Sequence, residues 1–360
     1  MKKRICILYY NAGAGHRSVA TALYNELSSK PELEVSLVNF IEKYQVTGFN
    51  KASQSYSFSL KYFSAFYGLI VKLVDTLPVL TAIRFIYKQN ANKYFQKFMQ
   101  DYPADIYISN CYYDNELFDY IKAKNPKTKT IMLVTDIVYA LRIWFNDKRD
   151  LILVPTQELY NNGFKYFNKY SKKVKIVGLP IAKEYFAKHD VSNLKQQLGL
   201  KDKQTILVSA GGEGISNIFE IVTVLDKHFH NLNICVICGK NTNLLQKLRA
   251  KSFNNNVKPF GWTDDFAKLL IVADLFLTKA GATSIWEAIT LNKKTIAFDL
   301  IKGQEEGNIE FAKKFINIEY VPDINNLAAS TNEMLKLVHN KRKQEFNSNA
   351  AQVIYKLLFN

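Results

Sequence analysis

Short runs of apolar residues alternate with segments of helical periodicity along most of the chain. Each apolar run is rich in β-branched residues and is bounded by polar or glycine-containing loops, which predicts strands. Short apolar strands that are each followed by a helix are typical of a parallel sheet covered on both faces. The predicted strands are 4–10, 35–40, 106–110, 129–135, 151–154 and 175–177, then 205–209, 233–238, 257–260, 275–278 and 294–298.

These strands form two series, which predicts two domains. Gly178-Leu-Pro-Ile181 ends the first series, and residues 183–200 are predicted to form a polar helical linker. We therefore expect an α/β protein with two doubly wound, Rossmann-like domains, residues 1–180 and 181–335. Domains of this kind bind ligands at the carboxyl ends of their strands, so we expect a cleft there. Residues 336–360 are predicted to contain a C-terminal helix that packs back toward the first domain.

The loop after the first predicted strand is rich in glycine and opens a helix. Gly13 and Gly15 allow positive φ angles and a close approach of a ligand to the backbone. The helix N-terminus favours anions, and His16 lies on its first turn, where a histidine is suited to act as a general base. A plain structural loop is the alternative interpretation of this motif.

A second glycine-rich loop follows the first strand of the second series. Its small residues and the helix after it are suited to hold a diphosphate, although a turn that simply needs glycine would have the same pattern. The residues concerned are Gly212, Glu213 and Gly214.

The next two strand-following loops carry more polar groups. The hydroxyls of Thr283 and Ser284 on a first helical turn suit phosphate oxygens, with Lys279 adding charge. Glu287, about one turn further along, faces the same way and can accept from both hydroxyls of a ribose. The loop after the following strand carries the hydrogen-bonding groups of Gln304, Glu305 and Asn308, which suit a sugar.

Taken in order, eight motifs resemble GT-B glycosyltransferases of the monogalactosyldiacylglycerol synthase and processive diacylglycerol glucosyltransferase family, with MurG as a more distant relative. The resemblance covers roughly residues 4–320. Where the family often has a His-Pro pair, this chain has Asn110-Cys111. The motifs are Gly13-Ala-Gly-His16, Val134-Thr-Asp136 with Trp144, Val154-Pro-Thr-Gln-Glu158, Gly178-Leu-Pro-Ile181, Gly211-Gly-Glu-Gly214, Phe260-Gly-Trp262, Lys279-Ala-Gly281 with Glu287-Ala288, and Gly303-Gln-Glu-Glu-Gly-Asn308.

The resemblance implies a UDP-sugar donor that is bound mainly by the second domain. The backbone around Phe260, Gly261 and Trp262 would hold the uracil, and Glu287 the ribose. Gly212–Gly214 and the turn from Gly281 through Ala282, Thr283 and Ser284 would hold the diphosphate. Gln304, Glu305 and Asn308 would hold the sugar.

The resemblance also implies a single-displacement transfer with inversion of the sugar carbon. A base removes the proton of the acceptor hydroxyl, and helix N-termini rather than a metal ion stabilise the leaving UDP. His16 is the first candidate for the base and Asp136 the second, although an Asp after a strand is equally suited to cap a helix. We expect no metal site and no cofactor.

The basic charge of the chain is concentrated in its first half. The formal net charge is +16; residues 1–182 carry 25 basic and 14 acidic side chains, and residues 183–360 carry 23 and 18. Residues 44–98 hold 13 aromatic residues interleaved with basic ones, which suits docking to an anionic membrane. The residues proposed for this docking are Lys61, Tyr62, Phe63, Phe66, Tyr67, Lys72 and Arg84.

Three other functions compete with a membrane-associated diacylglycerol hexosyltransferase. Nucleic-acid binding would also explain the charge, but no recognised nucleic-acid motif is present. Transfer to a polyprenyl or other lipid acceptor shares all donor motifs, and a non-catalytic GT-B-like protein would bind a nucleotide-sugar or a membrane without transfer. Because no predicted segment is long and apolar enough to span a bilayer, we expect a peripheral protein on the cytoplasmic face of the cell membrane. The sequence leaves the oligomeric state open.

Overall fold

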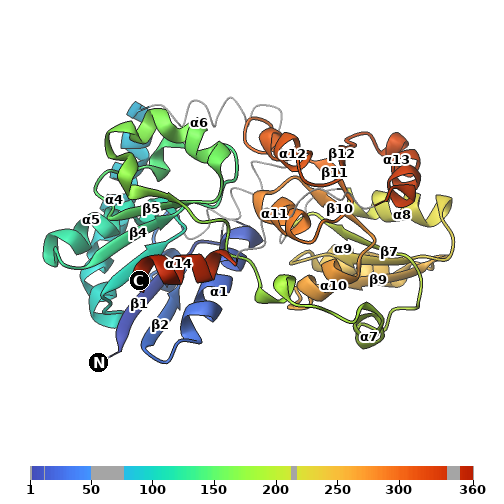
Figure 1. Ribbon diagram of the computed structural model, residues 1–360, viewed down its shortest axis with the longest axis horizontal. Helices are drawn as coiled ribbons and strands as arrows, with labels where there is room; N and C mark the ends of the chain where they lie inside the picture. The colour runs from blue at the N-terminus through green and yellow to red at the C-terminus, as the bar shows by residue number, and fades with distance from the viewer. Residues whose placement is uncertain (1, 12, 50–76, 212–216, 339–348, 360) are drawn as a thin grey trace. The chain divides into compact units, whose positions relative to one another are not determined.

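The computed structural model describes residues 2–11, 13–49, 77–211, 217–338 and 349–359. Its contacts divide the chain into two compact units, each with its own strands and helices (Figure 1). Unit 1 comprises residues 1–181, 302–304 and 348–360, and unit 2 comprises residues 182–301 and 305–347.

Unit 1 is built on a six-stranded parallel sheet with the strand order β2-β1-β3-β4-β5-β6. The chain runs from β1 to β2 in one direction across the sheet and then continues from β3 in the other. The loops after β1 and β3 therefore diverge, and this is the place where doubly wound sheets bind ligands. The strands are β1 (Lys3–Leu8), β2 (Leu33–Val38), β3 (Ile106–Ser109), β4 (Lys129–Leu133), β5 (Leu151–Val154) and β6 (Val174–Ile176).

Helices pack against the sheet of unit 1 through a large aromatic core. Side chains at alternate strand positions, such as Cys6, Leu8 and Met132, join a buried cluster to which α4 contributes Tyr87 and Phe98. The C-terminal helix α14 packs on α1. The helices are α1 (Ala14–Ser28), α2 (Phe40–Lys43), α4 (Leu77–Asp101), α5 (Asn115–Lys124), α6 (Gln157–Phe167) and α14 (Ala350–Phe359), with 3-10 turns η1 (Tyr112–Asp114), η2 (Arg142–Trp144) and η3 (Asn168–Lys173).

Unit 2 contains a second six-stranded parallel sheet, in the order β12-β11-β10-β7-β8-β9. The direction of travel reverses between β7 and β10, so the loops after these two strands form the corresponding ligand-binding position. The strands are β7 (Thr205–Ser209), β8 (Asn233–Ile237), β9 (Asn256–Phe260), β10 (Leu275–Lys279), β11 (Thr295–Asp299) and β12 (Ile318–Tyr320).

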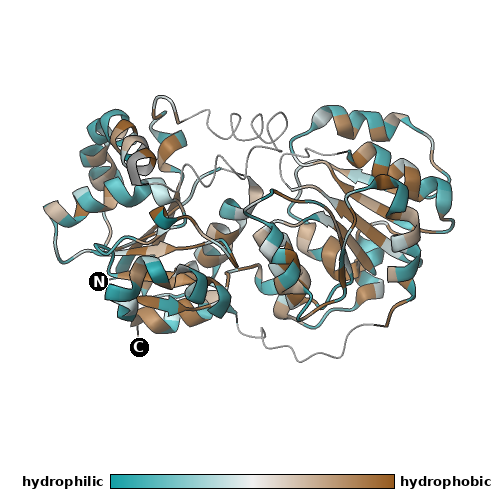
Figure 2. Ribbon diagram, turned by 90° about the horizontal axis from the view of Figure 1, so that it is seen from above, coloured by the Kyte–Doolittle hydropathy of each residue, from teal (hydrophilic) through white to brown (hydrophobic). Residues whose placement is uncertain are grey.

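The core of unit 2 is aliphatic. Val208, Val236 and Leu277 face a buried cluster that α8 and α13 complete with residues such as Leu225 and Met334. Figure 2 shows the hydrophobic strands inside each unit and hydrophilic residues on the outer helices. The helices are α7 (Val191–Gln197), α8 (Ile218–His228), α9 (Thr242–Ala250), α10 (Phe266–Val272), α11 (Ala282–Thr290), α12 (Glu306–Ala312) and α13 (Ile324–Lys336), with the 3-10 turn η4 (Lys183–Phe186).

The predicted class of two doubly wound α/β sheets is confirmed, with local differences. β2 ends at Val38 rather than at Phe40, because the Asn39 side chain accepts a hydrogen bond from Glu42 N and starts α2. The strand β12 was missing from the prediction. Within the residues that the structure describes, no helix is both long and apolar enough to cross a membrane.

Candidate active site

The loop between β1 and α1 places His16 at the ligand-binding edge of the sheet in unit 1. Gly13 precedes the helix with φ 95°, a conformation that glycine adopts without strain. No side chain caps the first turn of α1 at that position. Gly15 and His16 therefore lie on an open helix N-terminus directly after β1.

Two hydrogen bonds connect His16 to Asn110, the first residue after β3. His16 Nδ1 lies 2.9 Å from the backbone oxygen of Asn110, and Asn110 Nδ2 donates to the backbone oxygen of His16 at 2.6 Å. A carbonyl oxygen only accepts, so Nδ1 carries the proton. The Nε2 atom of the neutral ring is then the unprotonated nitrogen, which is the form a general base requires.

The surroundings keep the His16 ring neutral and fix its orientation. Trp144 stacks beside it, with ring centroids 6.3 Å apart and an interplanar angle of 18°. Thr135 Oγ1 lies 3.4 Å from Nδ1. Burial lowers the pKa of His16 to about 4, and the bond to the Asn110 carbonyl offsets only part of that effect. The ring is therefore neutral at pH 7, with the lone pair of Nε2 unprotonated.

The backbone that carries Asn110 is held by a buried polar group of its own. Ser109 Oγ donates to Asp114 Oδ2 at 2.6 Å and accepts from Cys111 N at 2.9 Å. Asp114 is 1% exposed, and burial raises its pKa to about 7. Sequence reasoning missed Ser109, Asn110 and Asp114 as parts of the site.

Asp136, the second candidate for the base, lies in the loop after β4. It follows Thr135 directly and is half-buried in unit 1. Its position at the carboxyl edge of the sheet agrees with the predicted location. His16 meets the geometric requirement of a base, because the hydrogen bond at its Nδ1 defines Nε2 as the acceptor nitrogen.

In unit 2 the N-terminus of α11 lies at the β7/β10 reversal. Gly281 precedes the helix and provides no side-chain cap, so the first-turn N–H groups face the loop region. Ala282, Thr283 and Ser284 form that turn and are all partly exposed. The arrangement suits an anion, as predicted for the diphosphate.

Glu287 lies one turn along α11 and is almost completely enclosed. It is 5% exposed, and burial raises its pKa to about 8. The Tyr185 hydroxyl of η4 donates a hydrogen bond to its carboxylate, which counters part of the rise. Sequence reasoning identified Glu287 but missed Tyr185.

Two of the residues predicted to hold the sugar make contacts within unit 2. Glu305 Oε1 lies 3.1 Å from Lys279 Nζ, and Glu305 Oε2 accepts from Ile301 N at 2.7 Å. Asn308 Nδ2 donates to the backbone oxygen of Ala280 at 2.9 Å. These bonds fix the loop before α12 to the end of β10. Gln304 lies in the same loop, in the short segment 302–304 that is grouped with unit 1.

The predicted uracil segment follows β9, the edge strand of its sheet. The Phe260 backbone oxygen accepts from Cys238 N at 2.8 Å, and Gly261 and Trp262 follow it. Trp262 is 46% exposed, with Lys240 Nζ 5.9 Å from the centroid of its ring. An exposed ring and a nearby cation form a surface on which a planar base can stack.

Several predicted residues fall outside the described part of the chain. They are Gly212, Glu213 and Gly214 of the diphosphate loop, and Lys61, Tyr62, Phe63, Phe66, Tyr67 and Lys72 of the membrane segment. Arg84 is described, and its Nε lies 2.6 Å from Glu116 Oε1. Within the described ranges, no group of three or more His, Cys, Asp or Glu side chains is placed to hold a metal ion.

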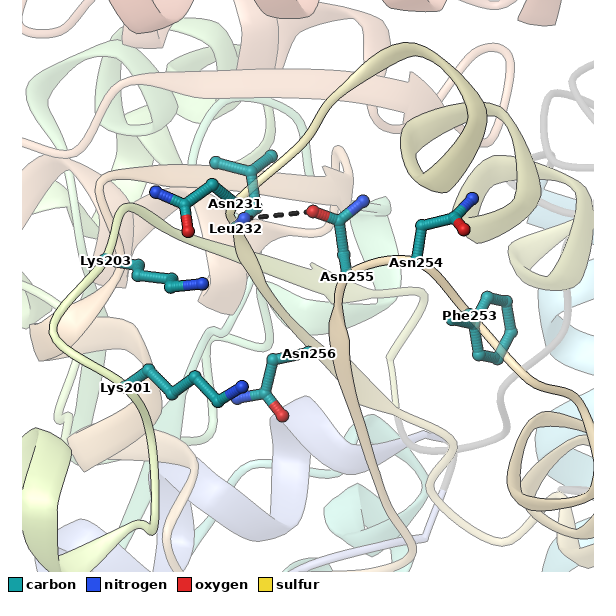
Figure 3. Close-up of a pocket in the computed structure, with 8 residues that line it drawn as sticks. All are labelled: Lys201, Lys203, Asn231, Leu232, Phe253, Asn254, Asn255 and Asn256. Carbon is teal, nitrogen blue, oxygen red and sulfur yellow. Dashed lines mark hydrogen bonds between the residues drawn. The ribbon is translucent and has the colours of Figure 1, made fainter.

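A polar pocket of about 430 Å³ lies in unit 2 at the amino ends of β7, β8 and β9, where these strands begin. Figure 3 shows Lys201 and Lys203 from the segment before β7, together with asparagines from the segment before β8 and from the start of β9 and the residues before it. Asn255 Oδ1 accepts from Leu232 N at 2.9 Å, so this amide already braces the backbone. The pocket contains none of the predicted donor-binding residues.

Two family models match the chain in succession. Residues 16–181 match the monogalactosyldiacylglycerol (MGDG) synthase family, and residues 205–357 match the glycosyltransferase family 28 C-terminal domain. The chain belongs to the glycosyltransferase family of the monogalactosyldiacylglycerol synthases and processive diacylglycerol glucosyltransferases. The family predicted from the ordered motifs is therefore confirmed.

The relatives of this glycosyltransferase have low sequence identity to it, but the alignments span most of each chain. The processive diacylglycerol beta-glucosyltransferase of Bacillus pumilus (strain SAFR-032) is 27% identical over 325 residues, which span 87% of this chain and 82% of the relative. The probable monogalactosyldiacylglycerol synthase 2, chloroplastic, of Oryza sativa subsp. indica is 27% identical over 331 residues, with 86% and 68% covered.

Solved structures with the same fold include enzymes of different activity. MurG of Acinetobacter baumannii matches with a TM-score of 0.58 and 14% identity, covering 99% of this chain and 98% of its own. UDP-GlcNAc 2-epimerase of Neisseria meningitidis, bound to UDP-GlcNAc, matches with a TM-score of 0.60 and 14% identity, covering 99% of both chains. This likeness confirms the GT-B-like fold. The activity has to be inferred from the residues of the site, because one fold carries many activities.

Proposed function

We propose that this glycosyltransferase is a membrane-associated inverting enzyme that moves a hexose from a UDP-sugar to diacylglycerol or to a glycosyldiacylglycerol. Its relatives include a diacylglycerol glucosyltransferase and a monogalactosyldiacylglycerol synthase, which supports the acceptor. The UDP-GlcNAc complex of a structural neighbour supports a nucleotide-sugar donor on this fold.

The observation that carries the proposal is the 2.9 Å contact between His16 Nδ1 and the backbone oxygen of Asn110. With the proton on Nδ1 held by the Asn110 carbonyl, Nε2 can accept a proton from an acceptor hydroxyl. The hydroxyl oxygen then attacks C1 of the hexose, and the bond between C1 and the phosphate oxygen breaks on the opposite face. UDP leaves with the bonding electron pair, the proton stays on Nε2, and the configuration at C1 is inverted.

Unit 2 supplies the groups that suit the donor. The N-terminus of α11 offers uncapped N–H groups for the diphosphate, where the negative charge grows as UDP leaves. Glu287 is assigned to the ribose and the surface around Trp262 to the uracil. We assign the step no metal ion and no cofactor.

The outer surface of α4 supports the membrane part of the proposal. Phe85 and Ile86 are 61% and 53% exposed on this helix, and Lys88 and Lys93 are exposed close to them. Apolar side chains flanked by lysines suit insertion at an anionic bilayer surface. We place the protein at the cytoplasmic face of the cell membrane as a peripheral enzyme.

The experiment that tests the function is a donor and acceptor panel with the products identified by mass. The protein is incubated with UDP-glucose, UDP-galactose or UDP-N-acetylglucosamine and vesicles that contain diacylglycerol or a polyprenyl phosphate. We expect hexosyldiacylglycerol and free UDP. Transfer only to the polyprenyl lipid would overturn the acceptor, and UDP binding without transfer to either lipid would point to a non-catalytic binding protein.

A further inference from the structure

Glu287 is an unusual residue for its surroundings. It is the one charged residue of α11, in a stretch where every residue from Ile285 to Thr290 is buried. Burying a carboxylate costs free energy unless hydrogen bonds compensate for the lost water. A carboxylate kept in such a place therefore needs a fixed donor within the protein.

Tyr185 provides that donor from a distant part of the sequence. Its ring is 5% exposed within η4, and its hydroxyl donates to the Glu287 carboxylate. η4 itself packs on α10, so the hydroxyl is delivered from a supported segment rather than from a free loop. A buried ring has little rotational freedom, so the hydrogen bond holds the carboxylate in one orientation.

We propose that Tyr185 is a positioning residue that orients the Glu287 carboxylate toward the ribose of the nucleotide donor. The inference rests on the proposed function, since it deepens the donor site of that function. A carboxylate has about four lone-pair directions. With one of them satisfied by Tyr185, the others are aimed so that both the 2′ and the 3′ hydroxyl can donate to the group at once.

This arrangement predicts selectivity for ribose. A site built to accept from two hydroxyls loses affinity for an analogue without them, because its buried acceptor is left unpaired. Removing the Tyr185 hydroxyl would loosen the carboxylate and reduce that preference. It would leave binding of a sugar-modified nucleotide that lacks both hydroxyls unchanged.

The test compares two nucleotides on variants of the full chain by titration calorimetry. The nucleotides are UDP and 2′,3′-dideoxy-UDP, and the variants are Tyr185→Phe, Glu287→Gln and the double variant. Tyr170→Phe is a matched control, because it removes a hydroxyl that donates to Phe145 O in unit 1. Thermal unfolding of each variant checks that it is folded, and Glu287→Gln tests the same contact from its other side.

We expect Tyr185→Phe to weaken UDP binding about 3- to 10-fold, the usual cost of one hydrogen bond. Binding of 2′,3′-dideoxy-UDP should not change, and Tyr185→Phe should have no further effect in the Glu287→Gln background. Equal loss for both nucleotides, or no loss for UDP, would overturn the role of Tyr185. Failure of the wild type to bind UDP would instead refute the donor assignment of the proposed function.

Discussion

Two hydrogen bonds join Asn110 to His16. The Asn110 side-chain amide bonds to the His16 backbone, and the Asn110 backbone carbonyl bonds to the His16 ring. The amide donates to the His16 backbone oxygen at 2.6 Å, and the carbonyl accepts from Nδ1 at 2.9 Å. The first contact fixes the start of α1, and the second fixes the tautomer. A residue directly after β3 thus determines the tautomer of a residue after β1.

Loss of the Asn110 amide should slow transfer more than it affects donor binding. We expect Asn110→Ala to lower kcat by about 10-fold, because a partly buried carbonyl at the start of α1 loses its donor, at about 1–3 kcal/mol. UDP affinity, measured by calorimetry, should stay within about 2-fold, since its proposed contacts lie in unit 2.

The matched control for this prediction is Asn162→Ala. The Asn162 amide also donates to a backbone oxygen in unit 1, that of Val138, at 2.9 Å. An equal fall in kcat for both variants would mean that the Asn110 effect is one of general stability.

The pH dependence of kcat at saturating donor should reveal the depressed pKa of His16. The base works in its neutral form, so activity is lost as pH falls through the pKa of about 4 rather than through the usual value near 6.5. We expect a constant kcat at saturating donor from pH 8 down to about pH 5, with circular dichroism confirming that the protein stays folded. A wild-type midpoint between pH 6 and 7 would contradict the enclosed environment of the His16 ring, if His16→Ala removes this midpoint and the other variants keep it.

Donor binding should release a proton from Glu287. Burial raises its pKa to about 8, so the free protein holds the proton at pH 7.5, while hydroxyls that donate to the group favour its ionised form. UDP affinity should therefore rise between pH 7 and 9. Calorimetry at pH 7.5 in two buffers of different ionisation enthalpy measures the released proton directly. Glu287→Gln should abolish the difference, and identical enthalpies for the wild type in both buffers would refute the linkage.

Vesicle binding should depend on the exposed lysines of α4 more than on Arg84. At roughly 1 kcal/mol for each lysine, Lys88→Gln with Lys93→Gln should weaken binding to anionic vesicles about 25-fold, with a strong salt dependence. Arg84→Gln should have a smaller effect, because Glu116 already offsets its charge.

Apolar insertion is tested separately with Phe85→Ser and Ile86→Ser in a sedimentation assay. Val191→Ser is the control, since Val191 is 41% exposed on α7 of unit 2. Equal binding of the wild type to neutral and anionic vesicles would refute the electrostatic part of the docking.

Asp114 should make unit 1 less stable as pH rises. Its folded-state pKa of about 7 lies above the usual 3.8, so the folded protein binds the proton more tightly and loses stability between about pH 4 and pH 7. The shift corresponds to ~4 kcal/mol in the free energy of unfolding. Urea unfolding at pH 5 and pH 8 should show the part of this fall that lies above pH 5, about 3 kcal/mol, for the wild type and none for Asp114→Asn. Parallel behaviour of the two proteins would contradict it.

Much of the fold follows from local sequence, and the exceptions have local causes. Apolar runs predicted eleven strands, and the clearest of them, such as β3 and β7, are buried along their whole length. The twelfth, β12, has three residues with Glu319 at its centre, too short and too polar to give a strand pattern. The end of β2 shifted because the cap made by Asn39 outweighs the apolar character of Phe40.

The site could be predicted where a residue type follows a strand and opens a helix. His16, Thr283, Ser284 and Glu287 were predicted in this way, and they lie on helices that directly follow a strand. Asn110 and Tyr185 were missed because their roles depend on partners far along the chain; His16 and Asn110 are 94 positions apart. No spacing rule relates such pairs, and only the pairing of β1 with β3 brings these two together.

The most direct test of the account is the single-turnover rate of hexose transfer to diacylglycerol by the wild type and by His16→Ala, with UDP affinity measured on the same preparations. Loss of a general base predicts a rate lower by about 10²- to 10⁴-fold, with UDP affinity unchanged within about 2-fold. An unchanged rate in His16→Ala would contradict the assignment of His16 as the base.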